Sequence, residues 1–127
     1  MATGEIHVMT IPVGAISNET VPIFKTPTAS QGGGITILSA SAIQGGTPDS
    51  SLRLVTMGTA GTSVSGTLTT TAVGGTASQF VNNVAKSWTL STAYVDPNTW
   101  VGVKEGNVEA ASADLRVTLN YLMGKTA

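Results

Sequence analysis

The residues that most often do chemistry in protein sites are scarce in this sequence. It contains a single histidine, His7, and no cysteine. A zinc site built on imidazole needs at least two histidines, and a thiolate site needs cysteine. A Ser-His-Asp triad would have to use His7, and no G-x-S-x-G turn is present to hold a serine nucleophile. We therefore expect no enzyme, no catalytic residue, no metal and no cofactor.

Two tryptophans, Trp88 and Trp100, are candidates for stacking on a sugar ring. Glycosidic chemistry would also need two acids facing a cleft lined with aromatic side chains. The seven acids lie mostly in expected turns, and the chain has only two residues each of Trp, Tyr and Phe. Burial at one end of a core is the commoner use of such tryptophans. A carbohydrate-binding module that uses Trp88 and Trp100 is kept as an alternative function.

The composition suits a subunit that is packed against neighbours. The 127 residues are enough for one domain, which we place at 1–127, and 41% of them are hydrophobic. Only 10% are charged, against about 25% in ordinary soluble domains. The six Lys and Arg residues are scattered along the chain, so we expect no nucleic acid as a partner. No apolar run approaches the roughly 20 residues that span a bilayer, so we expect no membrane either.

Apolar and polar residues alternate with a period of two along much of the chain, which indicates strands with one buried face. The pattern is clearest near the end, where Leu115, Val117, Leu119 and Tyr121 alternate with polar residues. Glycine, proline, asparagine and aspartate separate the candidate strands, as turns require. Short strands of this spacing predict an all-β antiparallel sandwich or a barrel with about eight strands. The other seven candidates are Ile6–Val13, Val21–Lys25, Ile35–Ile43, Leu52–Met57, Val64–Val73, Lys86–Ala93 and Thr99–Lys104.

One segment does not fit a strand as well. Ala77, Phe80, Val81 and Val84 follow the spacing of a helical face, and Thr76 could cap its start. This pattern predicts one short helix near residues 77–85, with a strand as the equal alternative.

Two stretches in the carboxy-terminal half are "WTLSTAYVDPNTWVGV" at residues 88–103 and "ADLRVTLNYLMGK" at 113–125. Together they resemble the last strands of small phage β-sandwich proteins. Proteins of this kind include the cement or decoration proteins of tailed-bacteriophage capsids. The resemblance implies a jelly-roll-like sandwich, often trimeric, on the exterior of the virion. Its partner would be the major capsid protein, bound where capsomers meet so that the expanded shell is stabilised.

We expect the amino-terminal residues 1–13 to form an extended arm that contacts the capsid. Ile6, Val8 and Ile11 would supply the apolar contacts of this arm. A tail-fibre or receptor-binding β module of the same kind of virus would share the composition, and it stays open as a further alternative.

Overall fold

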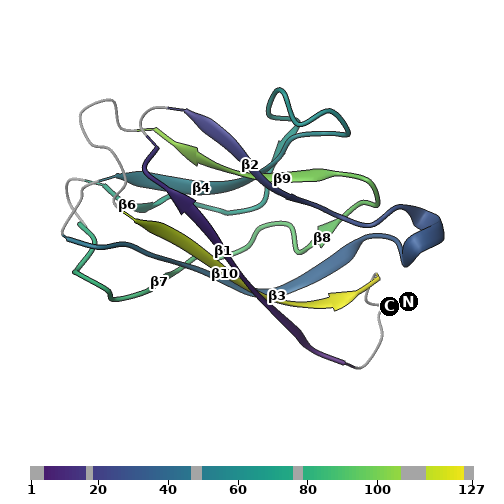
Figure 1. Cartoon of the computed structure of the whole chain (residues 1–127), viewed down its shortest axis with the longest axis horizontal. Helices are drawn as coiled ribbons and strands as arrows, with labels where there is room; N and C mark the ends of the chain where they lie inside the picture. The colour runs from purple at the N-terminus through teal and green to yellow at the C-terminus, as the bar shows by residue number, and fades with distance from the viewer. Residues whose placement is uncertain (1–4, 17–18, 47–49, 76–78, 107–113, 125–127) are drawn as a thin grey trace.

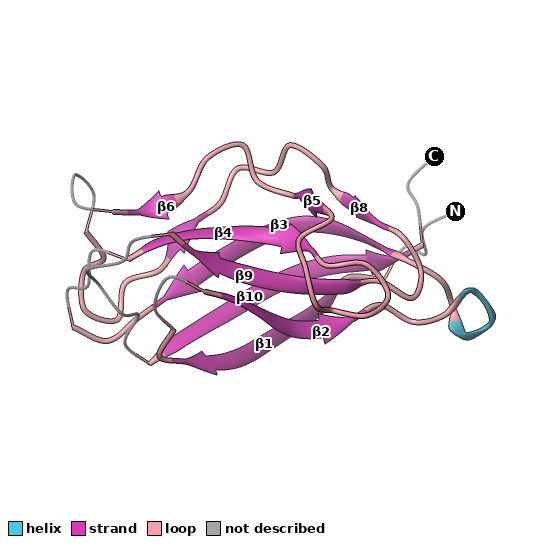
Figure 2. Ribbon diagram, turned by 90° about the horizontal axis from the view of Figure 1, so that it is seen from above, coloured by secondary structure: helices cyan, strands magenta, loops and turns pink. Residues whose placement is uncertain are grey.

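The alternating sequence folds into two antiparallel β-sheets that pack face to face, as the computed structural model shows (Figure 1, Figure 2). The structure describes residues 5–16, 19–46, 50–75, 79–106 and 114–124. Helical structure among these residues is one turn of 3-10 helix, η1 (Ala29–Gln31), in the connection after the second strand. None of the described helical residues forms a segment long and apolar enough to cross a bilayer.

Each sheet has five strands, and the first four long strands alternate between the sheets. The first sheet has the order β1-β10-β3-β7, and β8 also pairs with β3. The second has the order β2-β9-β4-β5, and β6 also pairs with β4. The strands of the first sheet are β1 (His7–Gly14), β10 (Leu115–Met123), β3 (Ile35–Ile43), β7 (Lys86–Ser87) and β8 (Tyr94–Val95). Those of the second are β2 (Thr20–Lys25), β9 (Trp100–Glu105), β4 (Ser51–Thr56), β5 (Gly66–Thr67) and β6 (Val73–Gly74).

The ten strands fill eight strand positions, because the four short strands lie in two pairs. β5 and β6 both lie along β4, and β7 and β8 both lie along β3. Each pair therefore occupies one position of an eight-strand arrangement in which the chain passes from sheet to sheet. Two four-strand sheets connected in this way are a jelly roll. The expected all-β antiparallel sandwich with a jelly-roll-like arrangement is confirmed.

The core lies between the two sheets and is built by the inward residues of the long strands. On β10, Leu115, Val117 and Leu119 are fully buried, as the alternation predicts, and Tyr121 is half-buried. Trp88 is also in the core, with 5% of its surface exposed. Its indole Nε1 donates a 2.9 Å hydrogen bond to the backbone oxygen of Leu52 on the opposite sheet, so the buried polar atom has a partner.

The helix predicted near residues 77–85 is wrong for the residues that the structure describes there. Residues 79–85 form an irregular segment with a turn at Asn82 and Asn83, and residues 77 and 78 lie outside the described part of the chain. Asn83 has a φ of 57°, which is the left-handed region and ends any helical run. Phe80 is buried, but Val81 and Val84 are more than half exposed, so the helical spacing does not mark a buried face.

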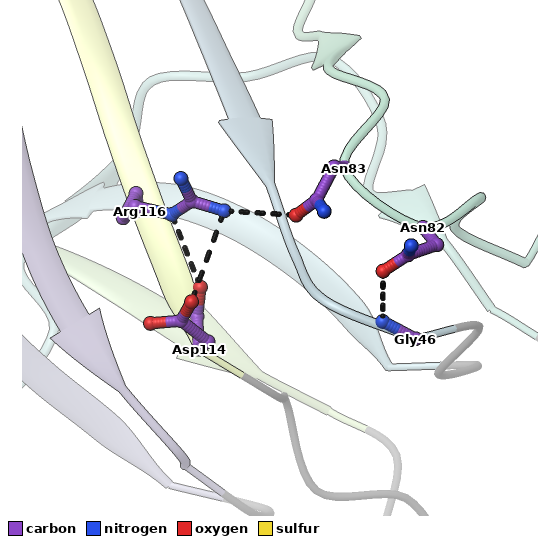
Figure 3. Close-up of polar contacts among 5 residues, drawn as sticks. All are labelled: Gly46, Asn82, Asn83, Asp114 and Arg116. Carbon is purple, nitrogen blue, oxygen red and sulfur yellow. Dashed lines mark hydrogen bonds and ion pairs between the residues drawn. The ribbon is translucent and has the colours of Figure 1, made fainter.

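Side-chain hydrogen bonds hold this turn in place (Figure 3). The Asn82 side-chain oxygen accepts a 2.7 Å bond from the backbone N–H of Gly46, in the loop after β3. The Asn83 side-chain oxygen accepts a 3.2 Å bond from Arg116 Nη2 on β10, and Arg116 also pairs with Asp114. Both asparagine side chains thus bind elements that are distant in the sequence. Local helical periodicity contains no information about such contacts.

Candidate interaction surface

One side of the sandwich is linked across from sheet to sheet. Thr69, which follows β5, forms an antiparallel bridge with Leu90, which follows β7. The backbone N–H of Thr70 donates to the Thr89 oxygen at 2.9 Å, and that of Ser91 donates to the Leu68 oxygen at 2.8 Å. These bonds satisfy edge groups of both sheets, so this side offers few backbone groups to another chain.

The opposite side is open. Among the described strands, β1 pairs only with β10, and β2 pairs only with β9, so each is the edge of its sheet. Figure 2 shows β1 and β2 along one side of the molecule and β5, β6 and β8 along the other. An edge strand presents unpaired N–H and C=O groups that can pair with a strand of another molecule. The sandwich therefore has one side suited to strand addition.

Two prolines in the sequence mark these edge strands. Pro12 lies within β1 and Pro22 lies within β2. Because proline cannot donate a ladder hydrogen bond, it is found in edge strands or at bulges. The pairing of β1 shifts register between Pro12 and Gly14, and that of β2 shifts between Pro22 and Phe24. Both prolines could have placed their strands at the sheet edges.

The expected amino-terminal arm is part of the first sheet over most of its described length. Residues 7–14 form β1 and pair with β10 from His7 opposite Tyr121 to Gly14 opposite Leu115. Residues 1–4 lie outside the described part of the chain. Residues 7–13 are therefore extended and form an edge strand, whose outer edge is available to a partner.

The three residues predicted to contact a partner do not share one face. Ile6 and Val8 are the most exposed large apolar residues of the described chain, at 61% and 65%. Val8 lies on the outward side of the first sheet, because alternate residues of a strand point to opposite faces, and Ile6 comes directly before β1. Ile11 has the opposite orientation and is half-buried. Ile6 and Val8 therefore form the exposed apolar pair, which we call the β1 edge pair.

The outer face of the first sheet, next to the β1 edge pair, is neutral and polar. Val8 lies opposite Asn120 of β10, and the Asn120 amide donates a 2.7 Å hydrogen bond to the hydroxyl of Ser39 on β3. One row further along, the hydroxyls of Thr10 and Thr118 lie 3.1 Å apart. Such a face can bind a partner through hydroxyl and amide groups without the cost of desolvating ions.

A groove separates the two edge strands. Its cavity measures about 190 Å³ and is mostly lined by apolar side chains. Tyr121 lines its wall, and the His7 ring stacks on the Tyr121 ring with centroids 5.4 Å apart. Met9 of β1 and the β2 residues Phe24 and Lys25 also line it, so both edge strands contribute to its walls. The complete lining is Met9, Phe24, Lys25, Thr26, Pro27, Ile35, Tyr121 and Met123.

A larger cavity of about 370 Å³ lies at one end of the sandwich, between the loop after β4 and the segment around β8. Its walls are mostly hydroxyl-bearing, including Thr56, Thr67 and Thr99, and Asp96 is the carboxylate on its described lining. Within the described chain, no group of three or more His, Cys, Asp or Glu residues is placed to hold a metal ion.

The two tryptophans have different positions. Trp88 is in the core and cannot present a ring to a sugar, which removes one half of the carbohydrate-binding alternative. Trp100 is half-buried on the outer face of the second sheet. Lys25 Nζ lies 5.9 Å from the centre of its ring, and the backbone of Gly61 packs against the same ring. Trp100 is thus partly covered by the chain itself.

No family model matches the sequence, and no curated protein matches it. A solved structure of the cyanophage Pam1 capsid asymmetric unit contains a chain with a similar fold. The two chains share 18% sequence identity and superpose with a TM-score of 0.58. The match covers 94% of this chain and 85% of the other. At this level of identity the similarity establishes the fold over nearly the whole length of both chains.

Proposed function

We propose that the protein is a structural component of a phage virion that binds the major capsid protein on the outside of the shell. It binds where capsomers meet and stabilises the expanded shell. The observation that carries the proposal is the β1 edge pair, two exposed apolar residues at the start of a free edge strand and beside a neutral polar face. The similarity of fold to a chain of a capsid asymmetric unit supports it. So does the resemblance of the carboxy-terminal half to phage β-sandwich proteins.

Binding to a neighbouring chain would use the open edge of β1 directly. A strand of the capsid protein adds to the edge and makes backbone hydrogen bonds, while Ile6 and Val8 are covered by its side chains. Covering a valine or isoleucine side chain contributes about 1.5–3 kcal/mol when burial is complete. The low charge of the outer face means that few ions lose their hydration when the surfaces meet.

The stabilisation of the shell would follow from mass action. A protein that binds the expanded shell and not its disassembled subunits lowers the free energy of the shell by an amount that grows with its concentration over its dissociation constant. We propose a homo-oligomer, with a trimer favoured, because several linked copies would bind several capsid chains at a high effective concentration.

The test is binding of the purified protein to expanded empty shells of the parent virus. We compare Val8→Lys with the matched control Val84→Lys, because Val84 is 52% exposed and lies after the turn at Asn82 and Asn83, outside both sheets. Substitution at exposed positions such as these changes stability by about 0.5 kcal/mol or less, so both variants fold. We expect Val8→Lys to bind more than tenfold more weakly and Val84→Lys to bind as the unchanged protein does.

A truncation gives a second measurement. Removal of residues 1–6 deletes Ile6 and keeps all of β1, so the sandwich should unfold at nearly the same urea concentration while shell binding weakens. Equal binding by Val8→Lys, Val84→Lys and the unchanged protein would show that the β1 edge is not the contact. Failure of the unchanged protein to bind any shell would overturn the function. A few copies found at one vertex of the particle would instead favour the tail or fibre alternative.

A further inference from the structure

The pairing of β4 with β9 places two cations side by side on the outer face of the second sheet. Arg53 of β4 lies directly opposite Lys104 of β9. Their neighbours Leu54 and Val103 form the next pair and are buried in the core, so Arg53 and Lys104 point away from it. Both side chains are exposed. On β2, the residue opposite Lys104 is Thr20, which continues the row with a hydroxyl.

A third cation lies on the same face. Lys25 of β2 lies opposite Trp100 of β9. Each is followed by a buried residue, so both side chains point outward. Between the row of Lys104 and the row of Trp100 lie Gly102, which is buried against the Met57 side chain, and Pro22, which is exposed. The two rows are four residues apart along β9, which is about 13 Å of extended strand.

Among the described residues, no ion pair involves Arg53, Lys104 or Lys25. The ion pair that the described chain forms is Arg116 with Asp114, on the other sheet. Glu105 follows Lys104 in β9 but is 1% exposed, and its carboxylate accepts a 2.8 Å hydrogen bond from the backbone N–H of Ser51. Like charges directly opposite each other in a sheet are destabilising. The Arg53–Lys104 pair thus weakens the isolated protein and contributes nothing to its core.

We propose that this face binds an acidic segment of a partner protein. Carboxylates placed on the Arg53–Lys104 pair remove the repulsion between the two cations, and an acid about 13 Å away along an extended segment reaches Lys25. Arg53 offers a planar guanidinium that can bind a carboxylate with two parallel hydrogen bonds. Between these cations Pro22 is exposed and the Met57 side chain covers Gly102, so a bound segment would cross an uncharged surface.

A protein segment fits this face better than a nucleic acid does. Affinity for nucleic acid comes from neutralising a run of phosphates, and a handful of contacts spread along the strand is the usual minimum. The face has three cations, two of them adjacent, on a protein whose net charge is −1. Binding here requires neither the β1 edge pair nor the capsid function proposed above.

The test is a solution NMR titration of the ¹⁵N-labelled protein with poly-L-glutamate, and separately with a single-stranded oligonucleotide. We expect poly-L-glutamate to shift the amide signals of Thr20, Lys25, Arg53 and Lys104 and to leave those of Thr118 and Asn120, on the first sheet, unchanged. The shifts should disappear at about 1 M ionic strength, where the Debye length is about 3 Å.

Matched variants isolate the cations from net charge. Arg53→Gln and Lys104→Gln should each weaken binding about two- to fivefold, the range for an exposed ion pair. Lys86→Gln changes the net charge equally on β7 of the other sheet, so it should leave binding unchanged. Because the like-charge pair is destabilising, Arg53→Gln should also melt at the same temperature as the unchanged protein or higher.

Three results would overturn the proposal. The first is the absence of shifts with poly-L-glutamate, or shifts spread over both sheets. The second is equal weakening of poly-L-glutamate binding by Lys86→Gln and Arg53→Gln, which would show that the binding depends on net charge alone. The third is stronger binding of the oligonucleotide at these same amides, which would make the face a nucleic-acid surface.

Discussion

Two buried threonines should respond in opposite directions to the same substitution by valine. Thr26 and Thr69 are each 3% exposed. The Thr26 hydroxyl donates a 2.6 Å hydrogen bond to the Asp96 backbone oxygen and accepts a 2.9 Å bond from the backbone N–H of Thr99. The Thr69 hydroxyl is buried and has no hydrogen-bond partner among the described residues. Valine has nearly the shape of threonine, so the substitution removes the hydroxyl and little else.

The expected magnitudes follow from these contacts. Thr26→Val leaves the Thr99 N–H and the Asp96 oxygen without their partner, and an unsatisfied buried group costs about 1–3 kcal/mol. Thr69→Val removes a hydroxyl that was itself desolvated without compensation, so we expect a gain of about 1–2 kcal/mol. For a chain of this length, 1 kcal/mol corresponds to about 4 °C in the melting temperature.

The assay is equilibrium unfolding in urea, followed by the fluorescence of the buried Trp88 and checked by calorimetry. The matched control is Thr70→Val, next to Thr69 in sequence, because Thr70 is exposed and its hydroxyl makes a 3.3 Å bond to the Thr89 oxygen. We expect the control to change the free energy of unfolding by about 0.5 kcal/mol or less. A loss of stability in Thr69→Val, or equal effects at Thr26 and Thr69, would refute the reasoning. The hydrogen-bond partners of a buried hydroxyl would then not decide the sign of the change in stability.

Two further predictions concern the core and one close approach of the backbone. Trp88→Phe removes the bond from the indole to the Leu52 oxygen and opens space, so urea unfolding should show a loss of about 2–4 kcal/mol. Gly74→Ala would place a methyl group against the Ser50 oxygen, whereas Gly75→Ala meets nothing within 4 Å, and both have positive φ. We therefore expect a loss of about 1 kcal/mol at Gly75 and at least about 2 kcal/mol more at Gly74, measured by thermal unfolding.

The long strands could be predicted because apolar and polar residues alternate over most of the length of each. The predicted Ile35–Ile43 is β3 itself, and the predicted Val21–Lys25 differs from β2 by one residue. The predicted Val64–Val73 and Lys86–Ala93 were each interpreted as one strand, and each is interrupted in the structure. A threonine-rich sequence favours an extended backbone but does not determine which strand that backbone pairs with. Here Thr69 pairs with Leu90 of the other sheet, a contact between segments far apart in the sequence.

The candidate surfaces depended on strand pairing even more strongly. The exposure of Ile6 and Val8 follows from the alternation, but the free edge beside them follows from the order of strands in the sheet. Arg53 and Lys104 are 51 residues apart in sequence and become neighbours only through the register of β4 and β9. Local patterns report which face of a strand is buried and contain no information about register between distant strands.

The unequal sides of the sandwich limit how far this molecule could associate by itself. β1 and β2 lie on the same side, so one neighbour seated there occupies both free edges at once. The far side is already tied from sheet to sheet by the Thr69–Leu90 bridge and the bonds around it. A strand added to β1 would therefore not create a second acceptor on the far side. Copies of the protein that add to one another through β1 therefore do not continue into a fibre. The protein can cover a surface of a partner without polymerising.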